Sequence, residues 1–181
     1  MAMGKENVRV LISQEELERR IAELAEQINR DYAGRSVDDS LVCIGVLKGS
    51  VFFLVDLLKK LTIPAKLDFF QTASYGSGMT AGEVRIRKDV DLAIRDKDVL
   101  LIEDIVDTGH TLRTILGLLR FRGAKSVRLC ALLDKAERRE VEVPIDYSGF
   151  QIENLFVVGY GLDFDERYRN LPYIGVVEME I

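Results

Sequence analysis

Short, continuous apolar runs alternate along the chain with segments whose apolar residues recur every three or four positions. Such runs are typical of strands buried in a parallel sheet, and the longer spacing predicts amphipathic helices. The expected strands are residues 8–12, 41–46, 66–72, 84–87, 99–102, 127–133, 155–160 and 171–177. The expected helices run from Ser13 to about residue 32, from about 51 to 61, and from 112 to about 124. The alternation predicts an α/β fold with a mainly parallel central sheet flanked by helices.

Most of the candidate chemistry lies in residues 99–111, which read VLLIEDIVDTGHT. Glu103, Asp104 and Asp107 follow a buried run, and Asp107 begins a tight turn that ends at Gly109. Because a helix follows this turn, its backbone N–H groups should meet the carboxyl edge of the sheet, where phosphate is well held. Carboxylates would repel that phosphate without a cation between them. The segment therefore predicts a phosphorylated ligand together with a divalent metal.

Composition narrows the class of protein. A chain of 181 residues suits a single domain spanning residues 1–181. The formal net charge of −5 argues against broad binding to nucleic acid or to an acidic membrane. We see no signal peptide and no apolar run long enough for a membrane span, so we expect a cytoplasmic protein. Cys43 and Cys130 lie in apolar runs and are expected to be buried free thiols, as in a reducing compartment.

Two further segments carry weaker signals. Lys48-Gly49-Ser50 opens a helix, where an ammonium and backbone donors could form a pyrophosphate cradle. A simple strand–helix turn is the alternative, and the pattern is not a Walker A loop. Residues 73–82 are small and glycine-rich, which favours a mobile lid over a reacting ligand. A flexible hairpin loop is the alternative for that segment.

The segment from Glu103 to Thr111 resembles the phosphoribosyl pyrophosphate (PRPP) binding motif of type I phosphoribosyltransferases, and most closely their hypoxanthine-guanine branch. The resemblance extends over residues 41–177 and includes the Leu-Lys-Gly turn at 47–49 and the run 156–169. It implies a type I phosphoribosyltransferase fold with a small hood lobe from the terminal segments and a mobile lid at about 73–84. In this family the matching Leu-Lys-Gly turn carries an unusual peptide bond.

The resemblance also implies a reaction. The phosphoribosyl group of PRPP would pass to N9 of hypoxanthine or guanine, giving IMP or GMP and pyrophosphate in purine salvage. Mg²⁺ is the implied cofactor, and a homo-oligomer, a dimer or tetramer, is the implied assembly. The implied residues are Asp107 as general base; Lys48, Gly49, Glu103, Asp104, Thr108, Gly109, Thr111 and Arg169 for PRPP and its phosphates; Ser74 and Tyr75 in the lid; Lys135, Phe156, Val157 and Asp163 at the purine; and Glu103, Asp104 and Asp163 for the metal.

Alternatives remain at this point. A regulator that keeps the PRPP fold but binds RNA would need a basic face, which the net charge disfavours. A magnesium-dependent phosphohydrolase could use the acid cluster but would not need Lys135 and Phe156. Lys135 follows a strand's carboxyl end, where open α/β sheets bind ligands, although a lone lysine is usually a surface residue. Arg169 could equally form a surface salt bridge.

Overall fold

The computed structural model describes residues 7–72 and 85–178. Its strands are β1 Asn7–Ile12, β2 Leu41–Val46, β3 Ala65–Thr72, β4 Ile86–Lys88, β5 Asp98–Val106, β6 Ser126–Asp134, β7 Tyr147–Gln151, β8 Val157–Val158 and β9 Ile174–Glu178. Its helices are α1 Gln14–Asp31, α2 Val51–Leu58 and α3 His110–Phe121, with a short 3-10 helix at Ala136–Arg138. No helix in this described part of the chain is long and apolar enough to cross a membrane.

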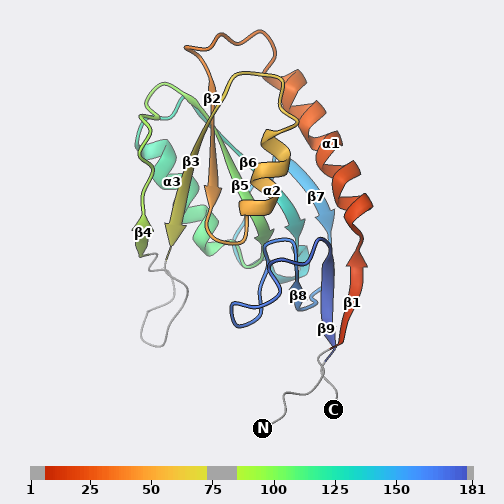
Figure 1. The fold of residues 1–181 in the computed structure, drawn as a ribbon. Helices are drawn as coiled ribbons and strands as arrows, with labels where there is room; N and C mark the ends of the chain where they lie inside the picture. The colour runs from red at the N-terminus through yellow and green to blue at the C-terminus, as the bar shows by residue number, and fades with distance from the viewer. Residues whose placement is uncertain (1–6, 73–84, 179–181) are drawn as a thin grey trace.

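Six strands form the central sheet in the order β4-β3-β2-β5-β6-β7. The five strands from β3 to β7 in that order run parallel, and β4 is antiparallel to β3. Helices α1 and α2 cover one face of the sheet and α3 covers the other (Figure 1). The predicted α/β fold with a mainly parallel sheet is confirmed, and it places the carboxyl ends of β2, β5 and β6 at one edge.

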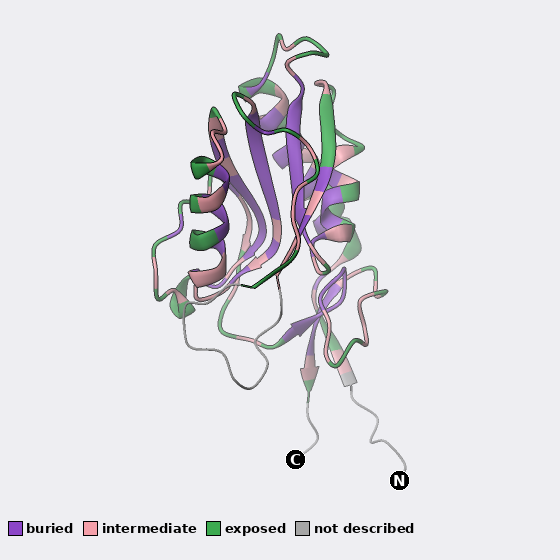
Figure 2. Ribbon diagram, turned by 90° about the vertical axis from the view of Figure 1, so that its left-hand side faces the viewer, coloured by how far each residue is buried: buried purple, intermediate pink, exposed green. Residues whose placement is uncertain are grey.

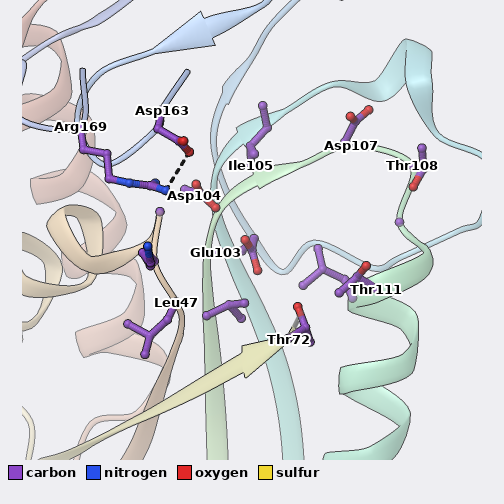
Figure 3. A pocket seen from close by; sticks show the side chains of 15 residues that line it. Leu47, Thr72, Glu103, Asp104, Ile105, Asp107, Thr108, Thr111, Asp163 and Arg169 are labelled. Atoms are coloured by element: carbon purple, nitrogen blue, oxygen red, sulfur yellow. Dashed lines mark ion pairs between the residues drawn. The ribbon is translucent and has the colours of Figure 1, made fainter. Parts of the chain in front are cut away.

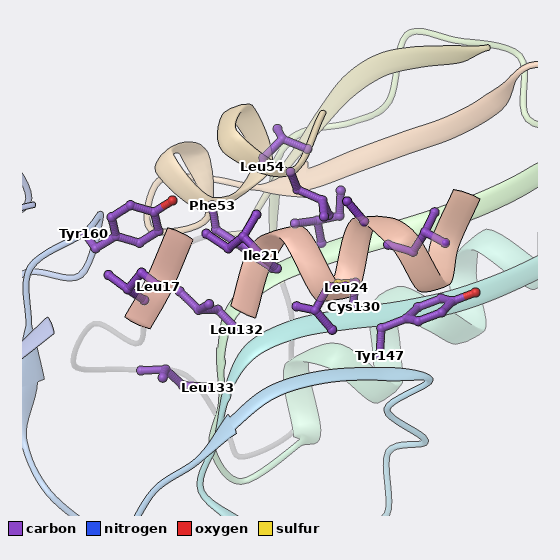
Figure 4. Close-up of a cluster of buried hydrophobic side chains, with 14 of the residues drawn as sticks. Leu17, Ile21, Leu24, Phe53, Leu54, Cys130, Leu132, Leu133, Tyr147 and Tyr160 are labelled. Atoms are coloured by element: carbon purple, nitrogen blue, oxygen red, sulfur yellow. The ribbon is translucent and has the colours of Figure 1, made fainter. Parts of the chain in front are cut away.

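Burial on both faces explains the apolar runs. Figure 2 shows the buried strands lying between helices on either side. On one face, α1 packs the residues at its helical repeat, among them Leu17, Ile21 and Leu24, against α2 and the sheet (Figure 4). The N-terminus of α1 has the expected capping box, in which the Ser13 hydroxyl and the Glu16 carboxylate each accept a backbone N–H.

A second, three-stranded antiparallel sheet has the order β1-β9-β8 and so joins the two ends of the chain. It lies beside the carboxyl edge of the central sheet (Figure 1). The predicted lid, with Ser74 and Tyr75, lies outside the described residues. Whether the small sheet acts as the hood stays a prediction.

The second helix ends earlier than predicted, at Leu58 rather than near residue 61. The side chain of Asn29 on α1 accounts for the difference. Its amide nitrogen donates to the carbonyl oxygen of Lys60 at 3.1 Å, and its oxygen accepts the N–H of Thr62 at 2.8 Å. These bonds stabilise a turn that leads directly into β3. Because these bonds come from a distant helix, local spacing did not reveal them.

Several strand boundaries also differ. β8 has only two residues instead of the predicted 155–160, because Gly159 and Gly161 have φ of +94° and +100° and turn the chain at once. β5 continues beyond residue 102 to Val106, so Glu103 and Asp104 belong to the strand itself. β9 begins at Ile174 rather than at residue 171. β7, an edge strand, was not predicted, since its sequence YSGFQ contains no apolar run.

Charged residues tie the strands together at the amino edge of the sheet. Asp98, which begins β5 and is 5% exposed, accepts hydrogen bonds from Arg35 and Ser126. Its carboxylate also lies 3.5 Å from the Lys125 ammonium. Burial acts to raise the pKa of Asp98, but the hydrogen bonds from Arg35 and Ser126 outweigh it and hold the pKa below its ordinary value. Asp98 therefore remains a satisfied, ionised group.

Replacing Asp98 with Asn should lower the free energy of unfolding by about 1.5–3 kcal/mol at neutral pH, because hydrogen bonds to a charged group are lost. The pKa of Asp98 is depressed in the folded state, so its contribution is complete above the unfolded pKa and is lost as pH falls through the lower folded value. Urea unfolding should show the difference from wild type shrinking below about pH 4. The exposed neighbour Asp96 is the control, and Asp96→Asn should change the free energy by less than about 0.5 kcal/mol. A difference that stays constant with pH would contradict the role of the charge.

Candidate active site

A cavity of about 330 Å³ opens at the carboxyl edge of β2 and β5. Its walls come from the β2–α2 turn, the end of β5, the β5–α3 turn and the loop after β8 (Figure 3). The predicted residues that line it are Lys48, Gly49, Glu103, Asp104, Asp107, Thr108, Gly109, Thr111, Asp163 and Arg169. Val46, Leu47, Thr72, Ile105 and Leu112 complete the lining, and sequence reasoning did not single these out for the site. The fold thus brings the expected PRPP residues together from three separate segments of the chain, at residues 48–49, 103–111 and 169.

Two adjacent carboxylates occupy the middle of this cavity. Glu103 and Asp104 end β5, and Asp104 is only 8% exposed. Burial raises the pKa of Glu103 well above its usual range, and the neighbouring Asp104 carboxylate raises it further. A pair of this kind favours a bound proton or cation over two bare charges. Among the described residues, no group of three acidic, histidine or cysteine side chains is placed to hold a metal alone. The pair therefore fits an ion such as Mg²⁺, which keeps waters and substrate oxygens among its ligands.

Close backbone packing fixes the position of Asp104. A Cβ atom on Gly49 would lie 1.7 Å from Oδ2 of Asp104, so a side chain at this position would force the Asp104 carboxylate to move. A Cβ atom on Gly161 would in turn lie 2.0 Å from the carbonyl oxygen of Gly49. The peptide bond between Leu47 and Lys48 is cis, which confirms the unusual peptide bond expected in this turn. The turn at residues 47–49 and the loop at Gly161 are thus in close backbone contact, and the Asp104 side chain packs directly on Gly49.

The turn between β5 and α3 forms the other side. Gly109 is the N-cap of α3 with φ of +93°, and no side chain of the described residues caps the helix. Its first-turn N–H groups therefore lack a side-chain acceptor, as in helix termini that bind phosphate. The loop after β6 supports the turn from behind: the carbonyl oxygen of Thr108 accepts the N–H groups of Glu140 and Val141 at 3.0 and 3.1 Å. Nε of Arg139 also donates to the carbonyl oxygen of Asp107 at 3.0 Å.

The cations of the site already have carboxylate partners. Nζ of Lys48 lies 2.9 Å from Oε1 of Glu166. Nη2 of Arg169 lies 2.8 Å from Oδ1 of Asp163 and 3.3 Å from Oε2 of Glu166. The hydrogen bond from Lys48, followed by that from Arg169, lowers the pKa of Glu166. Sequence reasoning missed Glu166, because one acid in the acidic run after Gly161 cannot be distinguished from a solvated one.

Lys135 lies directly after β6 and is only 7% exposed, so the surface alternative for this lysine is wrong. Its N–H donates to the carbonyl oxygen of Val106 at 3.0 Å, which fixes its backbone beside β5. No hydrogen bond or ion pair to its ammonium is found among the described residues. Burial lowers the pKa of Lys135, while the nearby charge of Asp107 opposes this shift. Asp107 itself lies 3.0 Å, Oδ1 to Nε, from the Arg138 guanidinium.

The remaining residues predicted for the purine lie apart from the cavity. Neither Lys135, Phe156 nor Val157 lines it. Phe156 precedes β8, is 53% exposed, and meets the ring of Phe164 edge-on at 5.5 Å between centroids. Val157 is buried, at 6% exposure. The residues predicted for PRPP all line this cavity, whereas of those predicted for the purine only Asp163 does.

Comparison with known proteins agrees with this geometry. Residues 11–165 match the model of the phosphoribosyl transferase domain, and the chain belongs to the phosphoribosyltransferase family. Individual relatives show to which branch of this family the chain belongs. The chain is 48% identical over 179 residues to a hypoxanthine phosphoribosyltransferase of Haemophilus influenzae, covering 98% of this chain and 99% of the relative. It is also 48% identical to the Escherichia coli enzyme of that name, over 96% of this chain and 97% of the relative.

A solved structure shows the same likeness in three dimensions. A hypoxanthine-guanine phosphoribosyltransferase from Bacillus anthracis, crystallised with HEPES in its active site, superposes with a TM-score of 0.89 at 42% identity. The match covers 95% of this chain and all of that chain. The resemblance found in the motif around Glu103 is confirmed, and the chain lies in the hypoxanthine phosphoribosyltransferase branch of its family.

Gly49 offers a direct test of the packing around Asp104. Gly49→Ala should lower kcat/KM for phosphoribosyl transfer about 10²-fold, because the added methyl group must displace the Asp104 carboxylate or the Lys48 turn. Gly117→Ala is the matched control, since nothing lies within 4 Å of a Cβ atom there. That control should leave activity unchanged and should stabilise α3 by up to about 1 kcal/mol. Steady-state kinetics and thermal unfolding of both variants would check this, and an active Gly49→Ala enzyme would contradict the packing.

Proposed function

We propose that this protein is a purine salvage enzyme that transfers the phosphoribosyl group from PRPP to N9 of hypoxanthine or guanine, producing IMP or GMP and pyrophosphate. One observation carries the proposal. Two regions suited to anions lie on opposite sides of the Glu103–Asp104 pair in a single cavity: the uncapped start of α3 and the Lys48–Arg169 cations (Figure 3). PRPP has a phosphate at one end, a pyrophosphate at the other and ribose hydroxyls between them, which matches this arrangement.

Each segment that lines the cavity would then bind one part of PRPP. Thr108, Gly109 and Thr111 hold the 5′-phosphate through their hydroxyls and the backbone N–H groups of the turn. Glu103 and Asp104 accept hydrogen bonds from the ribose hydroxyls. The remaining phosphate-binding residues, Lys48, Gly49 and Arg169, hold the pyrophosphate. Charge develops on this leaving group as the bond to ribose breaks, so fixed cations there stabilise the transition state more than the ground state.

Glu103, Asp104 and Asp163 are the proposed magnesium ligands. The raised pKa of Glu103 supports the first two, because a cation beside the two carboxylates would relieve the repulsion between them that contributes to this shift. Asp163 lines the same cavity, although its carboxylate pairs with Arg169. When bound, the ion would neutralise part of the pyrophosphate charge.

Four residues would bind the purine and accept its proton: Lys135, Asp107, Phe156 and Val157. The buried Lys135 ammonium, which has no fixed partner among the described residues, would donate to the 6-oxygen of the purine. Asp107, near enough to influence the pKa of Lys135, would take the proton that the purine loses as its nitrogen attacks. The exposed ring of Phe156 can stack on the base, and the backbone of Val157 can meet the base edge.

The lid, the assembly and the compartment complete the proposal. Ser74 and Tyr75 would close over the ligand and exclude water.

A homo-oligomer, dimer or tetramer, would cover exposed apolar side chains such as Phe52, Val55 and Leu67 on α2 and β3. The free, buried thiols of Cys43 and Cys130 suit the reducing cytoplasm.

The deciding experiment incubates the protein with PRPP, magnesium and each purine or pyrimidine base, and separates the products. IMP from hypoxanthine or GMP from guanine, lost on addition of excess chelator, is the expected result. Release of ribose 5-phosphate without any nucleotide would instead identify a phosphohydrolase. No reaction with any base, in a protein that still binds PRPP, would contradict the enzymatic proposal.

Lys135→Ala tests recognition of the base. Loss of a charge-assisted hydrogen bond should lower kcat/KM for hypoxanthine by about one to two decades, corresponding to roughly 1.5–3 kcal/mol. The KM for PRPP should change far less, and discrimination against adenine should shrink, because the ammonium no longer opposes the 6-amino group. Lys66→Ala, an exposed lysine on β3, serves as the control and should behave like wild type. A collapse in PRPP affinity with unchanged base preference would place Lys135 in the phosphate site instead.

Asp107→Asn tests the proton transfer. The amide keeps the shape of the side chain but cannot accept the purine proton, so kcat should fall about 10²–10⁴-fold. PRPP binding, followed by isothermal titration calorimetry, should change little because the turn stays held by its backbone bonds to the loop after β6. Near wild-type turnover would rule out Asp107 as the base.

A further inference from the structure

One acidic side chain, Glu166, bridges both cations that the proposed function assigns to pyrophosphate. Its Oε1 lies 2.9 Å from Nζ of Lys48, and its Oε2 lies 3.3 Å from Nη2 of Arg169. Lys48 and Arg169 line the cavity, whereas Glu166 does not. The carboxylate therefore already takes up hydrogen-bonding capacity of both cations that an anion in the cavity would need.

The backbone conformation around Glu166 determines where its carboxylate lies. Asp165 and Glu166 both have left-handed backbone, with φ of +52° and +59°. The N–H of Glu166 donates to Oδ2 of Asp163 at 2.9 Å, and Phe164 and Arg167 exchange two backbone hydrogen bonds across the turn. Non-glycine residues seldom adopt this conformation without compensation. The turn is thus tightly defined, and its geometry places the Glu166 carboxylate between Lys48 and Arg169.

We propose that Glu166 is the counter-ion that takes the place of pyrophosphate on Lys48 and Arg169 in the free enzyme, and that anion binding displaces its carboxylate. This inference rests on the proposed function of the cavity. The side chains of Lys48 and Glu166 are 53% and 65% exposed, so water screens the contact and a carboxylate leaves it at little cost. Pyrophosphate carries more charge than one carboxylate and can replace it, while a singly charged anion competes poorly. Glu166 is in this sense a positioning residue, which keeps both cations facing the cavity between turnovers and weakens product binding.

The test measures binding of inorganic pyrophosphate with magnesium by isothermal titration calorimetry at low ionic strength. Glu166→Gln removes the competing charge, so the dissociation constant should fall by roughly two- to fivefold, the range of one or two exposed ion pairs. Asp165→Asn is the matched control. It removes one negative charge from the adjacent left-handed position, but Asp165 forms no ion pair with Lys48 or Arg169 among the described contacts. Glu166→Asn, which suits left-handed backbone, replaces Glu166→Gln should that variant be unstable.

The expected result is tighter binding in the Glu166 variant alone, with the difference disappearing at high salt. If both variants bind pyrophosphate more tightly by the same factor, the cause is the loss of one negative charge near the site rather than the contact of Glu166. That result would overturn the proposal. Weaker or unchanged binding in Glu166→Gln would overturn it as well, since the carboxylate would then orient the cations without competing. Nucleotide formation by the wild-type enzyme is measured separately, so failure of the proposed function is distinguished from failure of this inference.

Discussion

The close approach of Gly49 to Asp104 is the constraint on which the rest of the site depends. Because Asp104 packs against a residue without a side chain, the turn at residues 47–49 can lie directly against the Asp104 carboxylate. Gly161 packs on Gly49 in the same way and brings in the loop that carries Asp163 and Arg169. Acidic and cationic groups are thereby held in one cavity by steric fit. The ion pairs of Lys48 with Glu166 and of Arg169 with Asp163 add to this steric fit.

Much of this was visible in the sequence, because local rules govern it. The apolar runs predicted the buried parallel strands, and the Asp-Thr-Gly segment predicted the turn at Gly109 that opens α3. Features set by distant contacts were not visible. Asn29 ends α2 from another helix, and β7 forms because β6 offers an open edge to a segment with no strand pattern. Glu166 was missed for the same reason, since its partner Lys48 is far away in the chain.

Lys135 shows where sequence reasoning and structure complement each other. Position after a strand suggested ligand contact, but only the structure shows that the side chain is buried. Burial lowers the pKa of Lys135, while the charge of Asp107 opposes this shift. The burial of a lysine at the carboxyl end of β6 supports the proposed base site, and no spacing pattern could have provided this argument.

The two edges of the central sheet treat charge in opposite ways. At the amino edge, the Asp98 carboxylate is satisfied by Arg35, Ser126 and Lys125, and this arrangement contributes to stability. At the carboxyl edge, Glu103 keeps a raised pKa and the α3 N-terminus lacks a side-chain cap. The stability that the protein gains at one edge offsets the unsatisfied charges and donors that it retains at the other. A bound cation would neutralise the Glu103–Asp104 carboxylates, and a phosphate would accept hydrogen bonds from the N–H groups at the start of α3. Ligand affinity here would therefore derive from interactions that folding alone leaves incomplete.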